Sequence, residues 1–144
     1  MRLIGLDYGE KTVGVAFTDA LGMTAIPGET IFREKENHLR KTLSKIGELV
    51  SERQTEKIIL GFPVHLDGTD SPISEKVKAF QKLLEARVEI PVELFDERLT
   101  TFSADELLSE MEIPKKKRKE VIDSLSAAVL LRDYMNEKEL KEKK

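Results

Sequence analysis

Three carboxylates in this sequence have the surroundings expected of metal ligands. Asp7 ends one short apolar run, and Glu97 follows another. Asp123 shares a face of a helical pattern with Ala127 and Leu130, where a carboxylate is costly unless it is paired or bound to metal. Carboxylate oxygens suit Mg²⁺ or Mn²⁺, and two such ions about 3.5–4 Å apart stabilise the attacking and leaving oxygens of phosphodiester hydrolysis. The residue types therefore predict a two-metal nuclease site.

Each of these carboxylates also has a purely structural interpretation. Asp7 can cap a turn, Glu97 can belong to a surface ion pair, and Asp123 lies four residues after Lys119, a potential salt-bridge partner. The metal interpretation requires the three to converge. In open α/β sheets, ligands bind outside the carboxyl ends of parallel strands. We therefore expect Asp7 and Glu97 to meet at such an edge if the first and last strands lie near each other.

The remaining composition excludes several other kinds of site. The absence of cysteine excludes disulfides, a thiol nucleophile and cysteine-based zinc or iron–sulfur centres. The two histidines, His38 and His65, are too few and too far apart in the sequence for a zinc site. His38 is expected to be solvated at the start of a helix. His65 falls in a loop beside the expected site and is a candidate substrate contact.

Charge is distributed unevenly along the chain. The net charge of −3 argues against a nucleic-acid binder, yet residues 111–144 carry ten Lys and Arg against seven Asp and Glu. A bulk charge does not reveal such a local patch, which can neutralise phosphates or simply be solvated. The candidate nucleic-acid contacts are Gly9, Lys11, His65, Arg98, Lys115, Lys116, Lys117, Arg118 and Lys119.

The elements that must position these residues follow from hydrophobic periodicity and turn signals. We expect a mixed five-stranded sheet flanked by helices, which opens as a three-stranded meander and continues with parallel strands separated by helices. Asn37 is a candidate cap for the first helix. The expected strands are 2–8, 12–19, 22–33, 57–61 and 92–95, and the expected helices are 37–53, 74–86, 100–111 and 117–136, with the basic run separating the last two.

Length and hydropathy limit the domain organisation and the location. The 144 residues fit one domain, expected at 1–136, followed by a Lys/Glu-rich tail at 137–144 that we expect to fray. No stretch approaches the roughly 20 apolar residues of a membrane span, and the acid at position 7 interrupts any apolar run of a signal peptide. We therefore expect a cytoplasmic protein that does not bind membranes.

Several blocks of the sequence together resemble a known family. They are Gly5-Leu6-Asp7-Tyr8-Gly9 with Gly14-Val15-Ala16, Gly61-Phe62-Pro63 with Asp67-Gly68, Phe95-Asp96-Glu97-Arg98-Leu99-Thr100-Thr101 with Ala104, and Asp123 with Ser126-Ala127-Ala128. In this order the blocks resemble the YqgF/RuvX family of pre-16S ribosomal RNA nucleases and Holliday junction resolvase-like proteins. The resemblance extends over about residues 1–136.

The resemblance implies a fold, a site and a substrate class. It implies an RNase H-like fold that brings Asp7 and Glu97 together, with Asp123 on the last helix completing the metal site. It also implies an endonuclease that processes the 5′ end of precursor 16S ribosomal RNA, with ribosomal precursor particles as partners. Relative to the junction resolvases of this fold, Ser126 stands where a fourth acid is expected, which argues against strong resolvase activity, and Asp96 is a further candidate for the metal shell.

Three other functions remain open at this point. Branched DNA is the close alternative substrate, because the same fold and acids serve both. The segment from Asp7-Tyr8-Gly9 to Gly14 also resembles the phosphate loop of actin–hexokinase-type phosphotransferases, although those enzymes need two such domains around the nucleotide. A non-catalytic RNA-binding or ribosome-binding module would keep the fold without turnover.

Overall fold

The fold was examined in a computed structural model, which describes residues 1–9, 11–35, 37–62, 72–96 and 115–142. Within α4, side chains are described for residues 124–138. The expected helix at 100–111 and the expected loop at 63–71 lie outside the described residues. The elements are β1 Leu3–Tyr8, β2 Thr12–Thr18, β3 Ala25–Phe32, α1 Arg40–Arg53, β4 Lys57–Phe62, α2 Pro72–Arg87, β5 Val92–Asp96 and α4 Lys115–Glu142.

The five strands among the described residues form one mixed sheet, as predicted, and their order is β3-β2-β1-β4-β5. The antiparallel part is the meander β1–β2–β3, and β1, β4 and β5 run parallel. The helices α1 and α2 provide the connections that parallel neighbours require. The first and last strands are therefore not adjacent, because β4 lies between them.

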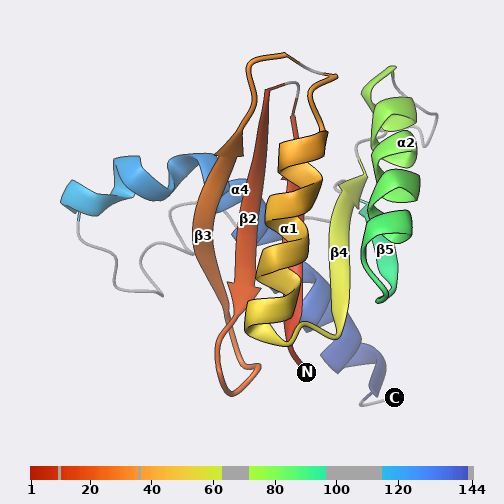
Figure 1. The fold of residues 1–144 in the computed structure, drawn as a ribbon. Coiled ribbons are helices and arrows are strands. Elements are labelled where there is room, and N and C mark those ends of the chain that lie inside the picture. The colour runs from red at the N-terminus through yellow and green to blue at the C-terminus, as the bar shows by residue number, and fades with distance from the viewer. Residues whose placement is uncertain (10, 36, 63–71, 97–114, 143–144) are drawn as a thin grey trace.

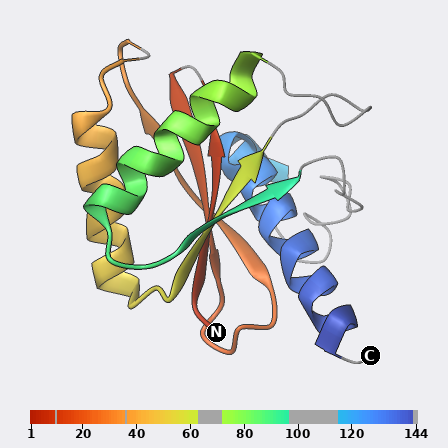
Figure 2. The ribbon, with the colours of Figure 1, turned by 90° about the vertical axis from the view of Figure 1, so that its right-hand side faces the viewer.

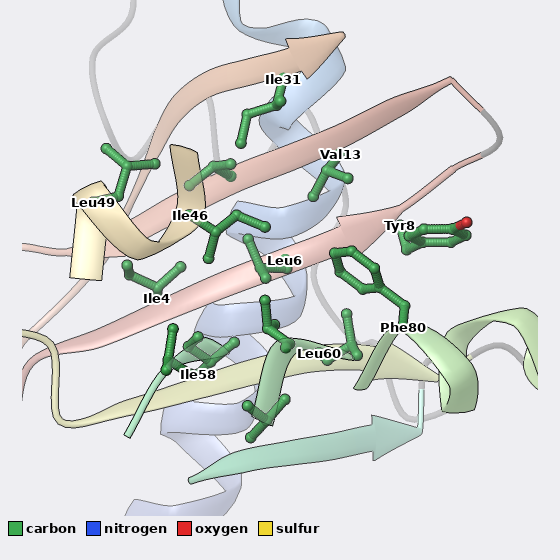
Figure 3. Packing of buried hydrophobic residues seen from close by; sticks show 14 of the residues in the cluster. Ile4, Leu6, Tyr8, Val13, Ile31, Ile46, Leu49, Ile58, Leu60 and Phe80 are labelled. Carbon is green, nitrogen blue, oxygen red and sulfur yellow. The ribbon is translucent and has the colours of Figure 1, made fainter. Parts of the chain in front are cut away.

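The sheet has a helical layer on each face (Figures 1 and 2). The helices α1 and α2 cover one face, and α4 crosses the other. Alternation along the strands sends Leu6, Val13 and Leu60 toward α1 and α2, where they meet Ile46 and Phe80 in a buried cluster (Figure 3). No helix among the described residues is both long enough and apolar enough to span a bilayer.

The layer formed by α4 is packed through small residues. An added Cβ at Gly5 would lie 3.0 Å from the Ala127 carbonyl oxygen and 3.0 Å from the Leu131 Cβ. Ala16, which pairs with Gly5 on β2, is fully buried in the same cluster as Ala127 and Ala128. The missing side chain at Gly5 therefore allows the helix backbone to approach β1 closely.

Two sequence expectations about helix ends were wrong. Asn37 does not cap α1, because the helix begins at Arg40 and its N-cap is Leu39, which makes no side-chain cap hydrogen bond. The last helix was expected to begin at 117, but α4 begins at Lys115, so the whole basic run 115–119 lies in its first turns. Lys and Arg are good helix formers, so the run extends the helix instead of interrupting it. The helix also continues to Glu142, through most of the segment expected to be a tail.

The close contact at Gly5 gives a stability prediction. Replacing Gly5 by Val forces α4 away from β1, and overpacking of this kind typically costs about 1–3 kcal/mol. Gly47→Ala is the matched control, since it removes a mid-helix glycine of α1 at a place where the new Cβ meets only the Arg87 side chain at 3.6 Å. The control should gain about 0.5–1 kcal/mol. Urea unfolding measures the free energy of unfolding of both variants. If the Gly5 and Gly47 variants were equally stable, the close packing of α4 on Gly5 would be contradicted.

Candidate active site

The carboxyl ends of the parallel strands β1, β4 and β5 form one edge of the sheet. The strand register pairs Leu6 with Leu60 and Gly61 with Phe95. Continuing the first pairing by one residue places Asp7 beside Gly61, level with Phe95. Two strand spacings separate β1 from β5, a distance of about 10 Å. Because Gly61 lies between them, no side chain of β4 occupies this gap at the level of Asp7.

Asp7 lies on the face of the sheet that α4 crosses. Its neighbours Leu6 and Tyr8 belong to the cluster under α1 and α2, so alternation turns Asp7 the other way. Asp7 is half-buried there. Asp96 ends β5 two residues after Leu94, which packs against the α1 and α2 cluster. Alternation therefore places Asp96 on the opposite face of the sheet from Asp7. This position argues against Asp96 as a ligand of the same metal ions.

Contacts along α4 show how the helix crosses this face. Ser124 donates a hydrogen bond of 2.8 Å from Oγ to the Gly28 carbonyl oxygen on β3. Further along the helix, Ala127 and Leu131 pack on Gly5 of β1. Read from its C-terminus, α4 thus passes from β1 to β3 while it rises toward the carboxyl ends of the parallel strands (Figure 2). Asp123 directly precedes Ser124 on this rising part of the helix.

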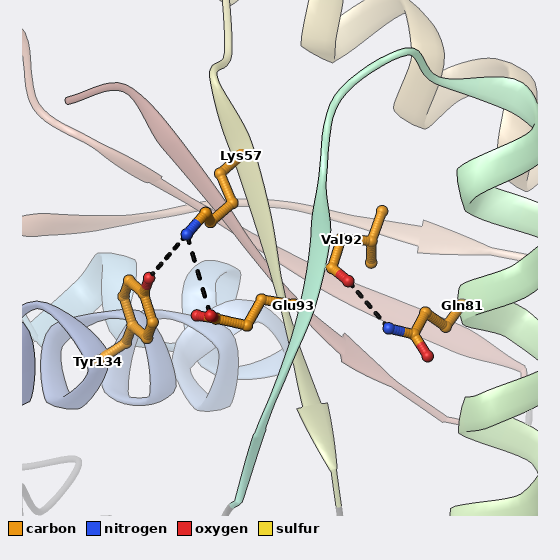
Figure 4. Close-up of polar contacts among 5 residues, drawn as sticks. All are labelled: Lys57, Gln81, Val92, Glu93 and Tyr134. Atoms are coloured by element: carbon orange, nitrogen blue, oxygen red, sulfur yellow. Dashed lines mark hydrogen bonds and ion pairs between the residues drawn. The ribbon is translucent and has the colours of Figure 1, made fainter.

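A polar cluster of Lys57, Glu93 and Tyr134 holds the other end of α4 (Figure 4). The Lys57 Nζ donates to the Tyr134 hydroxyl oxygen at 3.3 Å and lies 3.9 Å from the Glu93 Oε1. Burial, reinforced by the hydrogen bond with Glu93, raises the pKa of Tyr134, so its hydroxyl stays protonated. Phe95 packs edge-to-face on the Tyr134 ring at 5.7 Å. The cluster ties α4 to both β4 and β5.

The start of β5 is also bonded to α2, in the helical layer on the other face of the sheet. The Gln81 side chain of α2 donates a hydrogen bond of 2.9 Å to the Val92 carbonyl oxygen (Figure 4). β5 is an edge strand, so this carbonyl group gains a partner that no further strand provides. The strand that leads to Glu97 is therefore held from both layers.

The turn after Asp7 is braced by a buried arginine. The Arg33 Nη2 donates a hydrogen bond of 2.6 Å to the Gly9 carbonyl oxygen, and the guanidinium lies 4.8 Å from the centre of the Tyr8 ring. The Gly9 N–H donates to the Thr12 carbonyl oxygen at 2.7 Å. Both backbone polar groups of Gly9 are thus engaged inside the hairpin, whereas the Lys11 side chain is exposed.

Sequence reasoning did not identify Arg33 or the Lys57 cluster. Arg33 follows a strand and gives no signal of its own, since its partners come from the preceding hairpin. For Lys57 and Glu93, the available signal was their place on strands whose alternate residues turn to the α4 face. Both positions carry a charged residue on the face that α4 covers, so a polar partner on that helix was to be expected.

Several predicted site residues lie where the structure describes nothing of their side chains. Glu97, His65 and Arg98 lie outside the described residues. Asp123 and the basic run 115–119 are described as helix backbone only. Within the described side chains, no group of three His, Asp or Glu forms a metal centre. Ser126, at the position where resolvases carry a fourth acid, is exposed.

Comparison with solved structures identifies the fold. The structure of T. thermophilus RuvC in complex with a Holliday junction substrate matches 95% of this chain and 96% of its own chain, with a TM-score of 0.63 at 14% identity. The fowlpox virus Holliday junction resolvase matches 95% of this chain and 99% of its own, with a TM-score of 0.60 at 14% identity. The predicted RNase H-like fold is confirmed.

Comparison with known sequences identifies the family. A protein of Lachnospira eligens named "Putative pre-16S rRNA nuclease" is 47% identical over 96% of this chain and 99% of its own length. A protein of Listeria monocytogenes with the same name is 46% identical over 94% of this chain and 98% of its own. The family model described as "RuvX: Holliday junction resolvase" matches residues 1–137. The chain belongs to the RuvX family.

Proposed function

We propose that this protein is a metal-dependent endonuclease that hydrolyses phosphodiester bonds in precursor 16S ribosomal RNA, with Asp7, Glu97 and Asp123 as its metal ligands. The observation that carries the proposal is the position of Asp7. It lies half-buried at the carboxyl edge of the parallel strands, on the face along which α4 rises toward that edge. The names of the relatives support ribosomal RNA as the substrate.

The residues at this edge suit Mg²⁺ or Mn²⁺. Oxygen ligands from carboxylates are what these ions prefer, and a gap of about 10 Å between β1 and β5 leaves room for two carboxylates and the ions between them. Gly61, which lies between the strands, brings no side chain into this gap. When bound, the ions would supply the charge that stabilises the attacking and leaving oxygens. The protein would hold the ligands in place through β1, β5 and α4.

Cleavage of branched DNA is the second candidate function. It is favoured by the family description and by the resolvase fold. The exposed Ser126 in place of a fourth acid argues against it, because a serine hydroxyl brings no negative charge to the metal site. A cleavage assay in manganese that compares structured RNA, linear DNA and four-way junctions separates the two. Preference for junctions would overturn the RNA assignment while leaving the metal site intact.

Metal dependence is tested directly at Glu97. The purified protein should cleave its substrate with Mg²⁺ or Mn²⁺ and lose activity in excess chelator. Glu97→Gln should lower the rate by orders of magnitude, because the neutral amide binds a hard cation poorly. Glu89→Gln is the control, since Glu89 is exposed at the end of the sheet away from Asp7. Activity that persists in chelator, or equal rates for both variants, would contradict the proposed mechanism.

Thermal melts distinguish a metal ligand from a structural ion pair at Asp123. If Asp123 faces other carboxylates, like charges repel in the metal-free protein. Asp123→Asn should then melt at or above the wild-type temperature without metal, and gain less from added Mn²⁺. If Asp123 instead pairs with a buried cation, the substitution should cost about 3–5 kcal/mol. A low melting temperature with an undiminished Mn²⁺ shift would remove Asp123 from the site.

The basic run at the start of α4 is tested by salt dependence. Changing Lys115, Lys116 and Lys117 to Ala should weaken nucleic-acid binding and flatten its dependence on salt. Each lost phosphate contact reduces the log–log slope by roughly 0.7–0.9. Fluorescence anisotropy with a labelled RNA over a range of salt concentrations measures the slope. An unchanged slope would show that the run is only solvated.

A further inference from the structure

Phe32 is a large aromatic residue left exposed at the edge of the sheet that carries Asp7. It is the last residue of β3, and 69% of its surface is accessible. The ends of β1 and β3 and the start of β2 all lie at this edge, as the register shows: Asp7 pairs with Gly14, and Phe32 pairs with Thr12. The exposed ring can therefore contact a ligand that approaches this edge of the sheet.

Phe32 also lies on the same face of the sheet as Asp7. Val13 and Ile31 pair with each other next to the pair of Thr12 and Phe32, and both belong to the cluster under α1 and α2. Alternation therefore turns Thr12 and Phe32 to the α4 face. Two strand spacings and two residue steps separate Phe32 from Asp7, about 12 Å in all.

The face between Phe32 and Asp7 is lined by small residues. Gly14 of β2 and Thr30 of β3 form the row level with Asp7, and Thr12 lies beside Phe32. The helix α4 crosses β3 four residues earlier, at the Ser124 contact with Gly28, and so leaves Phe32 uncovered. Among the described residues, neither a ring nor a cation stacks on Phe32. The exposed, flat face of the Phe32 ring suits a planar ligand.

The charges around Phe32 do not explain ligand binding by themselves. Lys11 and Lys35 are exposed nearby, and the Arg33 N–H bonds the Lys11 carbonyl oxygen at 2.9 Å, which brings Lys11 beside the end of β3. Glu34 is exposed between them and offsets part of this charge. Recognition at this place would therefore depend mainly on the ring.

We propose that Phe32 stacks on an unpaired base of the nucleic-acid strand whose backbone passes Asp7. The inference rests on the proposed nuclease function and makes Phe32 a determinant of specificity for single-stranded segments. Every base has a π-face, so an aromatic side chain binds unpaired bases with little sequence preference. In a duplex the bases are stacked on one another, and the ring gains nothing. A flanking base within about 12 Å of the cleavage position is in range of the ring.

The first test measures binding in chelator, where no cleavage takes place. Phe32→Ala should weaken binding of a short single-stranded RNA by about 5- to 150-fold, which corresponds to the loss of one stacked base. Binding of an abasic strand with the same number of phosphates should be unchanged. The log–log salt slope should also be unchanged, because stacking releases no counterions. Phe32→Tyr keeps a ring and should bind as the wild type does.

Met23→Ala is the matched control for this experiment. Met23 is equally exposed, at 70%, but lies before β3 at the opposite end of the strand. Its replacement should leave binding of both strands unchanged. An equal loss on the RNA and the abasic strand for Phe32→Ala would overturn the proposal, since the missing contact would then be to the backbone.

A fluorescent reporter provides an independent readout, because the chain contains no tryptophan. The emission of Phe32→Trp should be quenched by the single-stranded RNA and not by the same strand annealed to its complement. Met23→Trp should respond to neither. Emission that changes with protein concentration but not with RNA would mean that β3 pairs with a second copy, and would also overturn the proposal. A failure to cleave would contradict the proposed metal-dependent nuclease. The binding results in chelator do not depend on cleavage, so their failure would contradict only the proposed role of Phe32.

Discussion

The close contact between α4 and β1 determines the geometry of the whole α4 layer. The helix approaches the strand through Gly5, where the Ala127 carbonyl oxygen and the Leu131 side chain occupy the space of a side chain. Two polar attachments then fix how the helix crosses the sheet, the Ser124 bond to β3 at one end and the Lys57 cluster at the other. A rigid helix held at three points leaves its remaining residues little freedom. The position of the Asp123 backbone relative to Asp7 follows from these contacts.

Most of the fold could be predicted from the sequence because periodicity is a local signal. Alternation in residues 12–19 and helical spacing in residues 37–53 reflect which faces are buried, so the five described strands and the helices α1 and α2 were located to within three residues. The parallel arrangement of β4 and β5 followed from the helix between them. The end of α1 was predictable in the same way, whereas its start was not, since Asn37 is a good capping residue that the chain does not use.

The site was predictable only in its residue types. Asp7 was located correctly at a strand end, but its level with Gly61 and Phe95 depends on pairing between strands far apart in sequence. The same holds for Arg33, whose guanidinium contacts Gly9 and Tyr8 across the hairpin, and for Tyr134, which reaches Lys57. Such contacts leave no periodic trace. The start of α4 was predicted two residues late, at 117 instead of Lys115, because a run of like charges gives no apolar periodicity.

The helix α4, which packs on one face of the sheet, follows all five described strands in the sequence and is therefore synthesised after them. All five strands, together with α1 and α2, leave the ribosome before the residues of α4. Until then, Leu3, Ile59 and Phe95 lack the apolar residues of α4 that pack with them in their buried cluster. An unfinished chain of this kind is prone to aggregate or to be recognised by chaperones. A chain that terminates before α4 therefore lacks the helix residues that complete this cluster, and the order of translation itself delays its completion until α4 has emerged.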